Sequence, residues 1–211
     1  MSNSSREKIL SRIKESMEEG RDYTFPLSDF DKHEFPMPED LLLTFKNELE
    51  SIGGHVSLCN DSSIIISEIE QLISKKGLET VFCLDSEIKK LAQEQKISLT
   101  DVDADFNNME AAITRCEYLV SRTGSIVISS THESGRRLNV FPPIHIVIAA
   151  KSQLVAFPTD ALNLLENRFG RNFPSLVSFI TGASRTADIE KTLVMGAHGP
   201  KELFVFIDES R

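Results

Sequence analysis

Hydrophobic positions recur at two different spacings along the chain, and these spacings predict its elements. Near the N-terminus, Ile9, Ile13 and Met17 repeat every four residues with Leu10 beside them. This is the spacing of an amphipathic helix, so we predict one there. Residues 22–38 follow with three prolines and three phenylalanines, a composition that excludes a continuous helix and indicates an extended arm.

The phenylalanines give this arm hydrophobic anchors for a surface. That surface belongs either to the chain's own core or to a second subunit, and the second case is a homodimer formed through the arm. The sequence thus divides into a helix and arm over residues 1–38 and a larger domain over residues 39–211.

From residue 39 onward, helical and strand-like segments alternate, which is typical of a mostly parallel sheet covered by helices. We predict an α/β fold in which glycines end helices and short β-branched runs form strands. The predicted helices are 39–52, 63–76, 86–95, 159–167 and 186–194. The predicted strands include 55–59, 80–84, 126–129, 145–150, 178–181 and 203–207.

Charge is distributed unevenly between the two halves of the chain. The net charge is -9, which argues against a generic nucleic-acid binder, because such proteins neutralise phosphates with Lys and Arg. The last hundred residues nevertheless have a slight excess of basic residues, whereas everything before them is strongly acidic. A small anionic ligand is therefore expected in the C-terminal half.

The cysteines do not form a metal-binding pattern. Cys59, Cys83 and Cys116 are far apart and include no Cys-x-x-Cys pair, so we expect reduced thiols and neither a zinc site nor an iron–sulfur cluster. An acidic stretch at 101–105 lacks the glycine and glutamate of a calcium-binding loop. The polar start of the chain and its short apolar runs predict a cytoplasmic protein without a transmembrane segment.

Three loops in the C-terminal half carry candidate chemistry. The first is Ser-Arg-Thr-Gly-Ser, where Arg122, Thr123 and Gly124 form either an anion-binding turn or a simple hairpin turn. The second contains His132 and, beside a glycine, the pair Arg136 and Arg137, which is either an anion clamp or two solvated side chains.

The third loop follows a buried strand and reads Gly-Ala-Ser-Arg-Thr-Ala-Asp-Ile-Glu. If a helix begins there, its free amides attract an anion, and Asp188 and Glu190 either cap those amides or act on the ligand. The two strongest nucleotide-binding motifs, Gly-x-x-x-x-Gly-Lys and Gly-x-Gly-x-x-Gly, are absent from the sequence.

The third loop, together with the Leu-Val-Met-Gly-Ala-His-Gly-Pro segment at 193–200, resembles the C-terminal signature of the LUD-domain family, the lactate-utilisation protein C or YkgG type. The Arg-Thr-Gly-Ser loop, Gly135-Arg136 and the segment Pro-Pro-Ile-His-Ile at 142–146 occur in the order that this family shows. The resemblance implies a Rossmann-like fold of the NagB/RpiA/CoA-transferase type with flanking helices.

The resemblance also implies a role as the non-redox subunit of a bacterial system that oxidises L-lactate with iron–sulfur proteins. The clusters are then carried by partner subunits, with no cofactor intrinsic to this chain, and this chain binds a small organic anion or a nucleotide-like ligand. The alternative is a stand-alone transferase or ligase that acts on a CoA, folate or phosphorylated substrate.

One departure from the family affects the predicted site. Arg122 stands where the family commonly has glutamate, which leaves Glu117 as the nearest carboxylate in sequence. The catalytic candidates are therefore Glu190, Asp188 and Glu117. The predicted ligand-binding residues are Arg122, Thr123, Gly124, Arg136, Gly182, Ser184, Arg185, Thr186 and His198.

Overall fold

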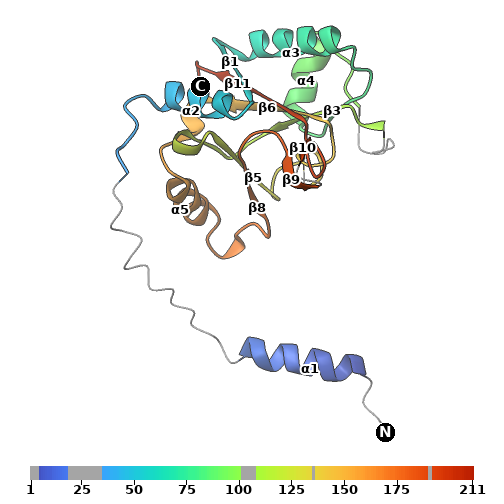
Figure 1. Cartoon of the computed structure of the whole chain (residues 1–211), viewed down its shortest axis with the longest axis vertical. Coiled ribbons are helices and arrows are strands. Elements are labelled where there is room, and N and C mark those ends of the chain that lie inside the picture. Colours follow the sequence, from blue (N-terminus) through green and yellow to red (C-terminus); the bar gives the residue numbers. More distant parts are fainter. Residues whose placement is uncertain (1–4, 19–34, 101–107, 135, 190–191) are drawn as a thin grey trace. The chain divides into compact units, whose positions relative to one another are not determined.

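The chain contains two compact units. The computed structural model describes residues 5–18, 35–100, 108–134, 136–189 and 192–211 (Figure 1). The two units are Met1–Pro36 and Met37–Arg211. In the first unit, helix α1 (Ser5–Glu18) exposes Ile9, Leu10 and Ile13, so the predicted apolar stripe is present on a helix. The sheets and the other helices belong to the second unit.

A five-stranded parallel sheet forms the centre of the second unit, in the order β1-β11-β6-β3-β2. Its strands are β1 (His55–Cys59), β2 (Val81–Cys83), β3 (Ala111–Arg115), β6 (Ile144–Ala150) and β11 (Glu202–Asp208). Because the strands are parallel, their carboxyl ends meet at one edge, where Asp208 lies in register with both Cys59 and Ala150.

A smaller sheet of four strands packs against the first, in the order β7-β4-β5-β8. Its strands are β4 (Tyr118–Val120), β5 (Ser125–Ser129), β7 (Leu154–Val155) and β8 (Val177–Ile180). Strand β5 pairs antiparallel with both β4 and β8. Both ends of β5 therefore lie beside other segments of the chain: Ser125 is next to β8 and the third loop, and Ser129 is next to the turn that precedes β4.

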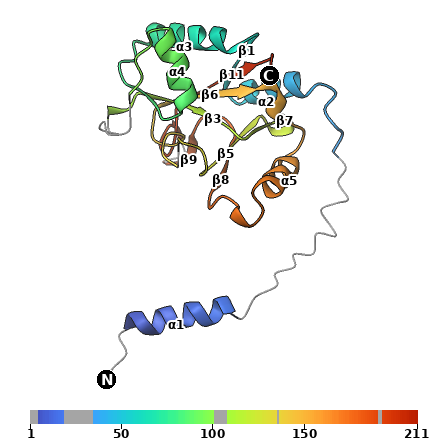
Figure 2. The same ribbon diagram turned by 180° about the vertical axis from the view of Figure 1, so that it is seen from behind.

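The two sheets and the helices form successive layers (Figures 1 and 2). Helices α3 (Ser62–Lys76) and α4 (Ser86–Glu94) cover one face of the parallel sheet, and helix α2 (Leu41–Ser51) and the smaller sheet cover the other. Helix α5 (Pro158–Phe169) packs on the outer face of the smaller sheet. Alternate residues of β11 enter the two cores, as the two-residue period of a strand requires.

Three aspartates begin the helices next to the parallel sheet. The carboxylates of Asp40, Asp61 and Asp85 each accept hydrogen bonds from two backbone amides in the first turn of α2, α3 and α4. Such caps satisfy amides that have no partner within the helix. The prediction that Asp85 caps a helix is confirmed.

The predicted α/β fold, with a Rossmann-like sheet and flanking helices, is confirmed, but one element near the C-terminus was predicted wrongly. The segment 186–194 is not a helix: β9 (Arg185–Ile189) and β10 (Thr192–Met195) form an antiparallel hairpin. Its many β-branched residues favour a strand. Strand β3 was missed because it is buried and lacks the alternation of a half-exposed strand.

Two further findings concern only the residues that the structure describes. Within these residues, no helix is both long and apolar enough to cross a membrane. The same part of the chain contains no group of three or more His, Cys, Asp or Glu side chains placed to hold a metal ion. The acidic stretch at 101–105 lies outside the described residues.

Candidate functional site

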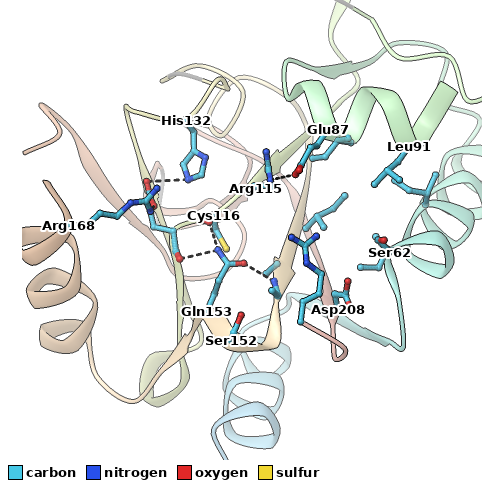
Figure 3. Close-up of a pocket in the computed structure, with 18 residues that line it drawn as sticks. Ser62, Glu87, Leu91, Arg115, Cys116, His132, Ser152, Gln153, Arg168 and Asp208 are labelled. Carbon is cyan, nitrogen blue, oxygen red and sulfur yellow. Dashed lines mark hydrogen bonds and ion pairs between the residues drawn. The ribbon is translucent and has the colours of Figure 1, made fainter. Parts of the chain in front are cut away.

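A pocket of about 470 Å³ opens at the carboxyl edge of the parallel sheet (Figure 3). The ends of β3, β6 and β11 contribute Arg115, Ala150 and Asp208 to its lining. Ile88 and Leu91 of α4 add apolar surface, and in Figure 3 Leu91 lies across the pocket from Arg168 and His132. Cavities of this size commonly bind small molecules.

Glu117 lies in the wall of this pocket and is almost fully buried, with a side chain that is 2% exposed. Its Oε1 accepts hydrogen bonds from the hydroxyls of Ser129 at 2.5 Å and Thr131 at 3.3 Å. Nε2 of His132 is 3.2 Å from the same oxygen. Nη1 of Arg168 donates to Oε2 at 2.9 Å. The carboxylate is thus surrounded by donors.

These donors determine the charge of Glu117. Burial raises the pKa of its carboxyl group, but His132, Ser129 and Arg168 outweigh burial and lower that pKa from its ordinary value of 4.5 to about 2. Glu117 is therefore ionised throughout the physiological pH range. A strongly perturbed carboxylate in the wall of a pocket is a marker of a functional site.

The amide of Gln153 fixes the backbone on which Glu117 stands. Its Nε2 donates to the carbonyl oxygens of Cys116 at 2.6 Å and of Glu117 at 3.0 Å, and its Oε1 accepts from the Ala150 amide at 2.7 Å. These bonds join the turn after β3 to the end of β6. The polar wall of the pocket is thereby tied to the parallel sheet.

A second ion-pair cluster lies near the N-terminus of α4. Nε of Arg115 donates to Asp85 and Nη1 donates to Glu87, each at 2.6 Å. Burial lowers the pKa of Arg115, but the hydrogen bonds and charges of Asp85 and Glu87 outweigh it and raise that pKa above its ordinary value. Since Arg115 is paired with two carboxylates, this part of the pocket carries no excess positive charge.

The structure brings the first and third loops together, but at the opposite end of β5 from Glu117. The Ser125 hydroxyl is 2.7 Å from that of Thr123 and 2.6 Å from that of Thr181, which precedes Gly182. Nη1 of Arg122 is 4.0 Å from Oε1 of Glu48 in α2. The two loops therefore pack around the C-terminal half of α2.

Close backbone approach explains the glycine in the first loop. Gly124 adopts a φ of +59°, and a Cβ there would lie 2.5 Å from the Leu49 amide nitrogen of α2. Only glycine fits such a position without displacing the helix. In the third loop, the Arg185 guanidinium donates to the carbonyl oxygen of Ile52, the residue that follows α2.

The helix start expected at the third loop is absent, since this segment is the hairpin of β9 and β10. The amide of Ser184 donates to the carbonyl of Pro200 at 2.8 Å, and the amide of Gly196 donates to the carbonyl of Ser184 at 2.9 Å. Thr186 is half-buried in β9, and His198 is exposed. Glu190 and the side chain of Asp188 lie outside the described residues.

The second loop contributes to the pocket through His132 alone of its titratable side chains. Arg136 is exposed and donates to the Ser175 hydroxyl, and Glu133 accepts from the amide of Ser86 at 2.7 Å at the start of α4. No local pattern indicated Arg168 or Gln153, which join Glu117 only through the fold. The predicted roles of the loop residues in ligand binding stay predictions.

In open α/β sheets, ligands bind in the crevice at the carboxyl ends of the strands. The fold and the position of the pocket therefore define this chain as an α/β protein with a pocket at the carboxyl edge of its parallel sheet. Residues 42–207 match the LUD domain, and the chain belongs to the LUD-domain family, as the sequence motifs predicted.

Named relatives give a narrower comparison. The chain is 30% identical over 172 residues to Lactate utilization protein C 1 of Bacillus mycoides, covering 79% of this chain and 71% of that protein. It is 25% identical over 162 residues to Lactate utilization protein C of Anoxybacillus flavithermus, covering 71% and 72%. A crystal structure of a DUF162 family protein from Deinococcus radiodurans matches with a TM-score of 0.61 and 17% identity, covering 80% of this chain and 96% of that one. At that identity, the structural likeness shows the fold.

Proposed function

We propose that this chain is a cytoplasmic, non-redox subunit of a bacterial system that oxidises L-lactate with iron–sulfur proteins. The observation that carries the proposal is the LUD-domain match over residues 42–207, together with similarity to proteins named lactate utilization protein C. In this role the chain binds a small organic anion or a nucleotide-like ligand and docks onto the subunits that transfer electrons.

The pocket at the carboxyl edge of the parallel sheet supports the ligand-binding part of this proposal. It combines the apolar surface of α4 with a polar wall built on Glu117. That wall also presents His132 and Arg168, two side chains that can donate hydrogen bonds to an anion. The buried network beneath them gives both groups a defined position before a ligand arrives.

The cysteines support the assignment of the clusters to partner subunits. Burial raises the pKa of the Cys59 and Cys83 thiols to about 12, and burial also raises the pKa of Cys116. Metal clusters bind the thiolate, so a raised pKa disfavours them. Cys59 and Cys83 also lie at opposite edges of the parallel sheet, because they end its two edge strands, β1 and β2.

Affinity purification of the full chain from its native host tests this proposal. The chain is expected to retain proteins that contain iron, measured by metal analysis and by the absorbance of iron–sulfur clusters in the eluate. A chain that elutes alone and converts an acyl-CoA, a folate or a phosphorylated substrate by itself would contradict the proposal and support the transferase alternative.

A further inference from the structure

Two side chains in the pocket are held at a fixed spacing by one carboxylate. His132 and Arg168 contact opposite oxygens of Glu117, at 3.2 Å and 2.9 Å. The two oxygens of a carboxylate are close together, so the imidazole and the guanidinium are neighbours. Figure 3 shows the side chains of His132 and Arg168 near each other at one end of the pocket.

The pairing with Glu117 also fixes which ring nitrogen of His132 faces a ligand. Because an ionised carboxylate carries no proton to donate, the 3.2 Å approach of Nε2 to Oε1 of Glu117 favours the neutral tautomer of His132 that has its proton on Nε2. Nδ1 is then an acceptor, and none of the described residues forms a hydrogen bond with it. A ligand hydroxyl can donate to this nitrogen.

Arg168 retains donors after its contact with Glu117. A guanidinium has five N–H groups, and one of its nitrogens, Nη1, bonds Glu117. The side chain is 61% exposed and lines the pocket. Its remaining N–H groups suit a carboxylate, which arginine binds through two parallel hydrogen bonds.

Glu117 itself is a positioning residue in this arrangement. Ser129, Thr131 and His132 surround its Oε1, and Arg168 occupies its Oε2. The burial of its side chain keeps it behind His132 and Arg168. A ligand in the pocket therefore meets one acceptor nitrogen and one cation, and the buried carboxylate holds both in place.

We propose that this end of the pocket binds a 2-hydroxy carboxylate. Its carboxylate accepts hydrogen bonds from Arg168, and its hydroxyl, on the adjacent carbon, donates to Nδ1 of His132. This inference rests on the proposed function, which it extends by naming the ligand class. One water fills roughly 30 Å³ of liquid, and a three-carbon acid fills only a few times that volume. The cavity of about 470 Å³ is therefore several times larger than a three-carbon acid. Ile88 and Leu91 line the rest, so 2-hydroxy acids with longer apolar side chains also fit.

The test uses the full chain labelled with ¹⁵N-histidine and titrated with L-lactate or propionate. The two acids differ at the hydroxyl that the proposal places on His132. His132→Gln identifies the His132 signals by their loss. We expect L-lactate to shift the Nδ1 signal of His132 saturably and propionate to bind at least roughly tenfold more weakly, because Nδ1 then loses its donor. Equal affinity for the two acids, or an unmoved Nδ1 signal, would overturn the inference.

Two arginine variants make the test specific to the pocket. Arg168→Gln removes the cation and should weaken L-lactate binding by roughly tenfold or more. Arg171→Gln, an exposed arginine that does not line the pocket, is the matched control and should bind as the wild type does. Equal affinity in Arg168→Gln and wild type would also overturn the inference.

Together with the affinity purification, the titration separates this inference from the proposed function. If lactate fails to bind while the chain still retains iron-containing partners, the ligand class is wrong and the proposed function stands. If the partners are also absent, both the inference and the proposed function fail.

Discussion

Replacing Glu117 with glutamine measures how strongly the buried carboxylate is stabilised by its donors. The change keeps the shape of the side chain and removes its charge, while one acceptor oxygen becomes an amide donor that faces other donors. The fall in the pKa of Glu117 from 4.5 to about 2 corresponds to about 3 kcal/mol at neutral pH. Arg168 is largely exposed and is screened by solvent, so we expect the variant to lose about 2–3 kcal/mol of unfolding free energy.

The pH dependence of this difference tests its cause. Because the folded state lowers the pKa of Glu117, its stabilisation is fully present above pH 4.5 and is lost as the pH falls toward 2. Urea unfolding followed by circular dichroism is the suitable assay, since the chain has no tryptophan. The gap between wild type and Glu117→Gln should shrink by about 1 kcal/mol from pH 7 to pH 3.5.

Glu166→Gln, in the same helix as Arg168 and exposed to solvent, is the control for losing one carboxylate. It should leave the unfolding free energy within about 0.5 kcal/mol of the wild type. The reasoning is refuted if Glu117→Gln is as stable as this control at pH 7, or if its deficit does not change with pH.

Three other predictions concern the packing of the loops, a buried histidine and the N-terminal helix. Gly124→Ala should lose more than about 2 kcal/mol of unfolding free energy, because its Cβ would meet the backbone of α2. Gly77→Ala, which has a similar φ but open space around its Cβ, is the control and should lose about 1 kcal/mol. Equal losses of the two variants in urea unfolding would contradict this. Burial lowers the pKa of His145 to about 3, so the folded chain resists its protonation. The wild type should therefore lose about 2 kcal/mol of unfolding free energy between pH 6.5 and 4.5, while His145→Gln should show a smaller loss; parallel pH curves would disprove the assignment. If the predicted homodimer forms through the N-terminal helix and arm, Ile13→Glu should halve the mass measured by light scattering, and an unchanged dimer mass would exclude the α1 stripe as its contact.

The fold followed from the sequence wherever local signals agreed with the tertiary structure. Asp85 combined a capping side chain with a helical pattern, and the strand at 203–207 combined β-branched and aromatic residues with a buried position. The hairpin at 185–195 was mistaken for a helix because Gly182 before it and the acidic residues within it resemble a helix start. The β-branched residues of the segment favour a strand, and the pairing between β9 and β10 establishes the hairpin.

The candidate site could be predicted only in part, because its members are distant in sequence. Glu117 was found as the carboxylate nearest in sequence to Arg122, and His132 was found in the second loop. The structure instead pairs His132 with Glu117 and adds Arg168 from the last turn of α5, 51 residues away from Glu117. A pairing of this kind depends on how β4, β5 and α5 pack, and no local spacing encodes it.

A crystal structure of the full chain soaked with L-lactate would show whether the pocket beside Glu117 binds a 2-hydroxy carboxylate. We expect electron density in the pocket at the carboxyl edge of the parallel sheet, with the lactate carboxylate on Arg168 and its hydroxyl on Nδ1 of His132. Lactate bound instead between the first and third loops, against Arg185, or an empty pocket at saturating lactate, would contradict it.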